Sequence, residues 1–505
     1  MSAQPLAESL VQSVDWLAVA PPAIAAAAGL VVLVADLFLP EARKPVLGWI
    51  SVAGLAVAAL MLLPLLDGDR STFCVTGATR ACSYTADHFT LVIQFLVLGG
   101  ALLAALLSVT NLADDQRRVP PGEFWFLLLS SAAGAALLPA SRDLATLIVA
   151  LEVASLPAFA LVGIRHGDKR SSEAALKFFL SSVTATAVSL MGVSFVYAST
   201  GTLYLTQVAQ RLPHVGGQLH TLAQAGVVLT LIGFAFKTAA VPFHFWVPDT
   251  YVGAPLPVAA YLSVVGKAVG FSGLILVTVV AFPSYADVWG PALAVLAALT
   301  MTVGNVGALR QQATRAYSAV RLLAWSSVGQ AGYLLVPIAA AGYAKDPQKA
   351  IGSTVAYALM YGAVNLGAFA VAAVVGRSRA LNRIADYRGL YAANPLTALL
   401  LAFFLLCLAG LPPGVIGLFA KVIVFSSAVD AGLGWLAVVM AVNVVIALFY
   451  YLQWTALLFR APEGEPARHR VPAPLTAALA LTGVLGVALS GAPQLVLRFA
   501  ATGLF

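Results

Sequence analysis

The chain has 505 residues, of which 61% are hydrophobic and only 10% are charged. A soluble globular protein carries about 25% charged residues, so this composition excludes a soluble enzyme or binding domain. The net charge of +7 is spread over loops too short to hold a nucleic-acid-binding domain, which argues against a nucleic-acid partner.

The apolar residues come in continuous runs, each long enough to cross a hydrocarbon core of roughly 30 Å as a helix. Backbone groups in lipid must bond internally, and unbroken rather than alternating runs favour helices. We therefore predict an all-α polytopic membrane protein with about 14 transmembrane helices. No Lys or Arg precedes Trp16, so the first run is predicted to be a span rather than a secretory signal. The predicted spans are 16–38, 46–66, 88–110, 123–140, 142–164, 174–199, 222–246, 255–282, 289–309, 321–341, 350–376, 396–428, 434–459 and 472–500.

Two of these spans contain a predicted break. In the seventh, Lys237 lies about one turn before Pro242, and in the twelfth, Lys421 follows the segment Gly410–Gly414, which contains two prolines. Proline removes a helix hydrogen bond and clashes with the preceding turn. The two broken spans run in opposite directions, which is typical of an inverted repeat. We predict two inverted five-helix repeats, with residues 1–122 forming three N-terminal helices, 123–282 the first repeat, 289–460 the second, and 461–505 a C-terminal helix.

The distribution of loop charge predicts the orientation. With the N-terminus outside, the cytoplasmic loops and flanks hold more than twice as many Lys and Arg residues as the outer ones. Because basic residues are enriched on the cytoplasmic side, both termini are predicted to lie outside. Cys74 and Cys82 would then share an outer loop, either as a disulfide or as two free thiols.

Few charges lie within the apolar spans. Of the 28 Lys and Arg residues, only Lys177, Lys237, Lys267 and Lys421 lie inside spans, while the others lie in loops or flank span ends. A lysine at the centre of a span costs roughly 2.5–3.5 kcal/mol, and such residues usually serve ion pathways or proton relays. A buried lysine can release its proton whereas arginine stays charged, so lysine suits a relay. Lys177 is the weakest candidate, because it lies near a span end and could reach the interface.

Two further residues are candidates for the same relay. Glu152 is the one acid predicted to lie well within the apolar depth, either as a structural partner of a lysine or as a relay member that tunes it. His244 follows the break in the seventh span, either as a hydrogen-bonded helix-end residue or as a relay member. The sequence has no cysteine cluster for an iron–sulfur centre and no glycine-rich nucleotide loop, so this chain is predicted to bind no cofactor or metal.

Three stretches resemble the antiporter-like subunits of the proton-pumping NADH–quinone oxidoreductase, respiratory complex I. They are Phe236–Asp249, Ala254–Ala259 and Leu322–Tyr333. Within that family the chain is most similar to subunit N, through Glu173–Leu180 and through lysine at both 267 and 421.

The resemblance implies a role for each buried residue. Glu152 and Lys237 would form the glutamate–lysine pair of the first half-channel, Lys267 would connect the halves, and Lys421 would be the exit-side lysine, while Lys177 matches a family lysine. Electron transfer would occur in partner subunits that hold NADH, FMN, iron–sulfur clusters and quinone.

The resemblance also implies a setting. The expected partners are other antiporter-like and small membrane subunits, in the inner (plasma) membrane of a bacterium. A subunit of a multi-subunit cation/proton antiporter shares this fold and is the alternative, and a membrane hydrogenase subunit is a weaker one.

Overall fold

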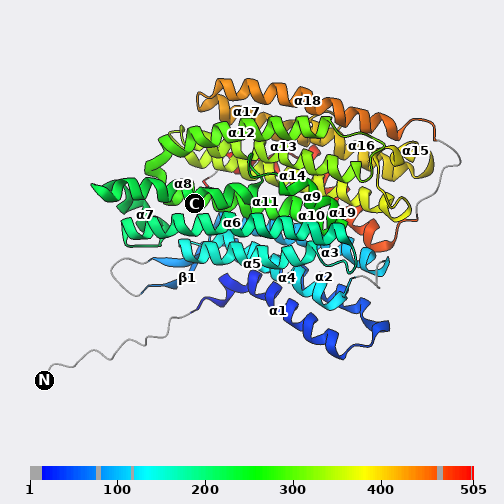
Figure 1. Cartoon of the computed structure of the whole chain (residues 1–505), viewed down its shortest axis with the longest axis horizontal. Coiled ribbons are helices and arrows are strands. Elements are labelled where there is room, and N and C mark those ends of the chain that lie inside the picture. Colours follow the sequence, from blue (N-terminus) through cyan, green and yellow to red (C-terminus); the bar gives the residue numbers. More distant parts are fainter. Residues whose placement is uncertain (1–13, 76–80, 115–118, 463–469, 502) are drawn as a thin grey trace.

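A computed structural model describes residues 14–75, 81–114, 119–462, 470–501 and 503–505. Within these ranges the regular secondary structure is helical apart from one two-stranded hairpin. Figure 1 shows the long helices side by side, with α1 along one edge of the molecule and α18 along the opposite edge. Some residues used to predict the orientation lie outside the described ranges, namely Arg80, Arg117, Arg118 and Arg468.

The predicted set of spans is confirmed. Thirteen helical segments of the described residues are long and apolar enough to cross a membrane, and the pair α16–α17 occupies the position of the predicted twelfth span. Aspartates cap the starts of several helices; the Asp143 carboxylate, for example, accepts a hydrogen bond from the Thr146 N–H at the start of α5. The helices are α1 (Trp16–Phe38), α2 (Pro45–Leu60), α3 (His88–Asp114), α4 (Pro121–Leu137), α5 (Leu144–Val162), α6 (Lys169–Thr200), α7 (Leu205–Arg211), α8 (Gln218–Thr238), α9 (Trp246–Gly253), α10 (Leu256–Tyr261), α11 (Lys267–Ile275), α12 (Ala286–Leu309), α13 (Ser318–Ala341), α14 (Pro347–Ser378), α15 (Leu390–Ala393), α16 (Pro395–Ala409), α17 (Val415–Asp430), α18 (Gly434–Leu458), α19 (Ala473–Gly491) and α20 (Gln494–Leu497).

The loop between α2 and α3 forms a hairpin that the sequence did not predict. Strands β1 (Arg70–Cys74) and β2 (Cys82–Ala86) pair in antiparallel register, and a disulfide joins Cys74 to Cys82. The structure thus selects the disulfide over two free thiols. On the opposite ends of the helices lies a surface rich in arginine, here called the basic face, which carries Arg165, Arg310, Arg321, Arg377 and Arg388.

Both predicted breaks are present. The seventh span ends as a helix at Thr238, and α9 begins only at Trp246, so the predicted helix to residue 246 is too long. The twelfth span divides into α16 and α17 around residues 410–414. The two predicted repeats have the same internal order. In each repeat the fourth element is the broken one, and it packs against the third and the fifth. The first set is α4, α5, α6, α8–α9 and α10–α11, and the second set is α12, α13, α14, α16–α17 and α18. This correspondence supports the predicted pair of five-helix repeats.

The eighth span differs from the single regular helix expected over 255–282. It consists of α10, a π-helical segment (Leu262–Gly266), α11 and a second π-helical segment (Leu276–Ala281). Such wide turns concentrate at functional sites, and neither π-helical segment contains a proline that would have indicated it. With α13 and α14, this span is the most buried part of the molecule, whereas α1, α2 and α18 expose apolar side chains along much of their length.

Two glycines allow the broken helices to pack closely. A Cβ atom on Gly270 of α11 would lie 2.5 Å from the Thr238 backbone nitrogen at the end of α8. A Cβ atom on Gly417 of α17 would overlap the Cys407 carbonyl of α16. Any larger residue at either position must therefore push the two helix backbones apart.

We expect Gly270→Ala to destabilise the protein by about 1–3 kcal/mol, because the added methyl group has no space against backbone atoms. Thermal unfolding of the purified assembly measures the effect. Gly99→Ala in α3 is the matched control, since no heavy atom lies within 4 Å of a Cβ there. Equal melting temperatures for the two variants would contradict the close packing of α8 and α11.

Candidate functional site

Lys237 is buried near the end of α8. Its Nζ lies 5.4 Å from the ring centre of Phe159 and 5.2 Å from that of Phe178, within the range of a cation–π interaction. Glu152 on α5 is near enough to attract it electrostatically. However, neither Lys237 Nζ nor Glu152 Oε1 has a hydrogen-bond partner in the described part of the chain. The structure therefore brings the predicted pair into one region without a direct ion pair.

The break after α8 is held in place by side chains from other helices. Ala239 adopts a left-handed conformation (φ 67°), which ends the helix. The Val241 N–H donates to Thr300 Oγ1 of α12 at 2.9 Å, and the Trp246 indole donates to the Phe236 carbonyl at 3.3 Å. The break is thus a fixed part of the fold, positioned by α12 and by its own second half-helix.

His244 lies within this break and is half-buried. Its ring centre lies 5.6 Å from that of Trp325, and its Nδ1 is buried with no hydrogen-bond partner among the described residues. No contact links His244 directly to the buried lysines, so its place in a relay stays a prediction.

Lys267 begins α11, directly after the first π-helical segment. Its side chain is buried, and its Nζ donates to the Thr238 carbonyl at 3.4 Å. Thr238 is the last residue of α8 and the neighbour of Lys237. Lys267 is therefore hydrogen-bonded to the backbone of the residue that follows Lys237.

Lys421 shows the same arrangement in the second half of the chain. Its buried Nζ donates to the Leu408 carbonyl at 3.0 Å and to the Ala409 carbonyl at 2.6 Å, at the C-terminal end of α16. The Tyr333 ring centre lies 5.6 Å away. The C-terminal end of a helix carries a partial negative charge, so the broken helices α8 and α16 each present such an end to an ammonium group.

Lys177 does not share this buried environment. Its side chain is 48% exposed and forms ion pairs with Glu173 (2.7 Å) and Asp249 (3.0 Å), and Asp249 also pairs with Arg321 (3.3 Å). Lys177 therefore lacks the buried setting of the other three lysines and lies near the start of α6 at the basic face, which fits the alternative that it reaches the interface. Its place in a relay stays a prediction. Asp249, its counter-charge, was not identified from the sequence because it lies in the segment between two spans.

Sequence reasoning also missed a group of buried hydroxyl and amide side chains near Lys421. The Tyr357 hydroxyl donates to Gln330 Oε1, and Gln330 Nε2 lies 3.3 Å from the Tyr451 hydroxyl and 3.5 Å from the Leu408 carbonyl. Leu408 is also a partner of Lys421. Polar side chains one turn apart in α13 and α14 were the available signal, but scattered Tyr and Gln residues are common in apolar helices.

The described residues contain no group of three or more His, Cys, Asp or Glu side chains that could hold a metal ion. The arrangement instead offers separated ammonium groups, a carboxylate and hydroxyls inside the membrane region. Ammonium, carboxylate and hydroxyl groups can each accept and release a proton.

The chain is similar to known membrane proteins. Residues 141–447 match the family described as NADH:quinone oxidoreductase/Mrp antiporter, TM. NADH-quinone oxidoreductase subunit N 2 of Streptomyces griseus is 74% identical over 514 residues, covering 99% of this chain and 96% of that protein.

Two solved structures share the fold. A chain of respiratory complex I from Thermus thermophilus is 33% identical and superposes with a TM-score of 0.75, over 96% of this chain and 100% of that chain. A chain of the Mrp complex from Dietzia sp. has a TM-score of 0.82, over 96% of both chains, but only 21% identity, so it shows the fold alone. The chain therefore belongs to the family of NADH–quinone oxidoreductase N subunits, the antiporter-like, proton-translocating membrane subunits of respiratory complex I.

Proposed function

We propose that protons cross the membrane through this chain along Glu152, Lys237, Lys267 and Lys421. The observation that carries the proposal is that all three lysines are buried and that none has a carboxylate within ion-pair distance among the described residues. A carbonyl or an aromatic ring stabilises an ammonium group less than a carboxylate does. Each lysine can therefore change its protonation state when a neighbouring charge moves.

The relay has a natural order along the chain. Lys237 lies near Glu152 at one end, Lys267 touches the residue after Lys237, and Lys421 is reached through the second repeat. A shift of charge or hydration near Glu152 would alter its attraction for Lys237, and the proton would then pass towards Lys267 and Lys421. Lys177, paired with Asp249 at the basic face, lies upstream of this series, and His244 lies beside it.

Electron transfer belongs to partner subunits in this proposal. NADH, FMN, iron–sulfur clusters and quinone would be bound there, and the partners in the membrane would be other antiporter-like and small subunits of the complex. The apolar surfaces of α1 and α18 offer edges for such neighbours and for lipid.

We also propose that the chain lies in a bacterial plasma membrane with both termini outside. The basic face would then be cytoplasmic, in agreement with the enrichment of basic residues on that side. The Cys74–Cys82 disulfide supports the same orientation, since disulfides persist in an oxidising exterior and are rare in the cytoplasm.

We expect Lys237→Ala and Glu152→Gln each to lower NADH-driven proton uptake in inverted membrane vesicles on the order of tenfold or more, because each removes a group that exchanges the proton. Lys237→Arg should lower proton uptake equally, since arginine keeps its charge but does not release its proton. Lys345→Ala, at an exposed lysine, is the control. Normal proton uptake by fully assembled complexes carrying Lys237→Ala would show that the proposed relay is wrong.

Cysteine labelling in intact cells tests the orientation. After treatment with a membrane-impermeant reductant, Cys74 and Cys82 should react with an impermeant maleimide, because the hairpin faces outward. Ser172→Cys, introduced at the exposed start of α6 in a background without those two cysteines, should react only after permeabilisation. The reverse labelling pattern would overturn the proposed orientation.

A further inference from the structure

Phe178 of α6 lies at the centre of a group of buried aromatic rings around Lys237. Its ring stacks on that of Trp246 of α9, with 4.3 Å between the ring centres and 13° between the planes, and meets Phe159 of α5 edge-on at 4.7 Å. Phe178 is 0% exposed, and Lys237 Nζ lies 5.2 Å from its ring centre and 5.4 Å from that of Phe159. We call Phe159, Phe178 and Trp246 the aromatic clamp. Its three rings come from three different helices, so it exists only in the folded protein.

The aromatic clamp is also connected to the helix that carries Lys237. Phe236, the residue before Lys237, lies against Trp246 with the ring centres 5.5 Å apart, and its carbonyl accepts the hydrogen bond from the Trp246 indole. This bond fixes the Trp246 ring relative to the end of α8, and Trp246 in turn supports the ring of Phe178. The position of the Phe178 ring relative to Lys237 is therefore fixed from two sides, by Phe159 and by Trp246.

The Lys237 ammonium group lies beside these rings rather than against Glu152. Glu152 and Phe159 are about two turns apart on α5, so they share one side of that helix and are separated by roughly 10 Å along its axis. Lys237 Nζ is within cation–π range of Phe159, and it has no hydrogen-bond partner among the described residues. Glu152 nevertheless attracts the ammonium group electrostatically. The rings and the carboxylate thus act on the same charge from different places along α5.

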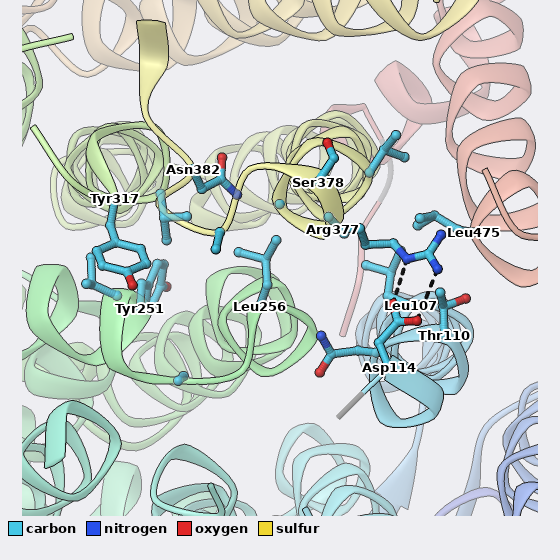
Figure 2. A pocket seen from close by; sticks show the side chains of 18 of the residues that line it. Leu107, Thr110, Asp114, Tyr251, Leu256, Tyr317, Arg377, Ser378, Asn382 and Leu475 are labelled. Atoms are coloured by element: carbon cyan, nitrogen blue, oxygen red, sulfur yellow. Dashed lines mark hydrogen bonds and ion pairs between the residues drawn. The ribbon is translucent and has the colours of Figure 1, made fainter. Parts of the chain in front are cut away.

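An ion pair at the basic face joins the two helices that supply Phe178 and Trp246. Lys177, the neighbour of Phe178, pairs with Asp249 at 3.0 Å, and Asp249 lies about one turn after Trp246 on α9. Helices α6 and α9 are therefore joined twice, by stacked rings inside and by charges outside. On another side, α9 borders a cavity of about 720 Å³ that Tyr251 lines (Figure 2), so that side gives it less support. The position of Trp246 therefore depends strongly on the contacts with α6.

We propose that Phe178 is a positioning residue, which holds the Lys237 ammonium group apart from Glu152 by a cation–π interaction, and that Lys177 acts through Phe178. The negative face of an aromatic ring attracts an ammonium group, and this attraction is largest where water is excluded. Rings hold a charged lysine less firmly than a carboxylate does, so a change at Glu152 can draw the ammonium group out of the aromatic clamp. The inference rests on the proposed lysine relay and adds what controls its first lysine.

Fluorinated phenylalanines at position 178 test the interaction, because each added fluorine weakens the negative face of the ring with little change in its shape. In inverted membrane vesicles that contain the complete complex, NADH-driven proton uptake per assembled complex should fall stepwise through the mono-, di- and trifluoro forms, by about tenfold in all. The same series at Phe124 is the matched control, since Phe124 is equally buried and packs edge-on against Trp125. A merely structural role predicts the same response at both positions. That result, or a flat or rising series at 178, would overturn the proposal.

Two substitutions at Lys177 separate a positioning role from a proton-carrying one. Lys177→Arg keeps the charge that pairs with Asp249 but does not release its proton, whereas Lys177→Met removes the charge and keeps most of the side chain. We expect Lys177→Met to lower proton uptake severalfold and Lys177→Arg to restore most of it. Lys349→Met, which breaks an exposed ion pair with Asp430, is the control. If Lys177→Arg is as slow as Lys177→Met, or if Lys177→Met is normal, Lys177 does not act through Phe178.

Lys237→Ala, measured in the same vesicles, separates failure of this inference from failure of the relay. If Lys237→Ala abolishes proton uptake while the fluorinated series at position 178 is flat, the aromatic clamp does not control Lys237 and the lysine relay stands. If proton uptake is normal with Lys237→Ala, the lysine relay is wrong, and the inference about Phe178 is wrong with it.

Discussion

The structure depends on the interaction between buried ammonium groups and the carbonyl ends of two broken helices. Thr238 at the end of α8 accepts from Lys267, and Leu408 and Ala409 at the end of α16 accept from Lys421. An intact helix would use these carbonyls internally, so the breaks are what make them available. The low dielectric of the interior strengthens such bonds, yet a carbonyl does not fix the charge state as a carboxylate would. Other features, including the glycine contacts at Gly270 and Gly417, bring lysine and helix end together.

Lys237 differs from the other two lysines, and the difference gives the series a direction. Its ammonium group rests between aromatic rings and is attracted by Glu152 without touching it. Lys237 is thus held by aromatic rings and by a charge at longer range, whereas Lys267 and Lys421 are held by hydrogen bonds to carbonyls. This asymmetry suits the proposed relay, in which the signal arrives at the end of the series where Lys237 lies.

The first and second repeats meet at side chains that are far apart in the sequence. Ser263 comes from the eighth span, Ser327 from α13 and Tyr361 from α14, and their hydroxyls and carbonyls are in direct contact. These spans are also the most buried, so the polar contacts are shielded from lipid. The outer helices supply the apolar surface that makes such a polar interior tolerable in a membrane.

The sequence alone determined the helical membrane fold, the two breaks and the buried positions of Lys237, Lys267 and Lys421, because a charge or a proline inside an apolar run has few physical explanations. Tertiary structure decided the rest. Whether Lys177 is buried depends on which side of α6 meets other helices, and the pairing of Tyr361 with Ser263 and Ser327 depends on three spans meeting at one depth. The π-helical turns before and after α11 likewise follow from packing between helices, which no local residue pattern records.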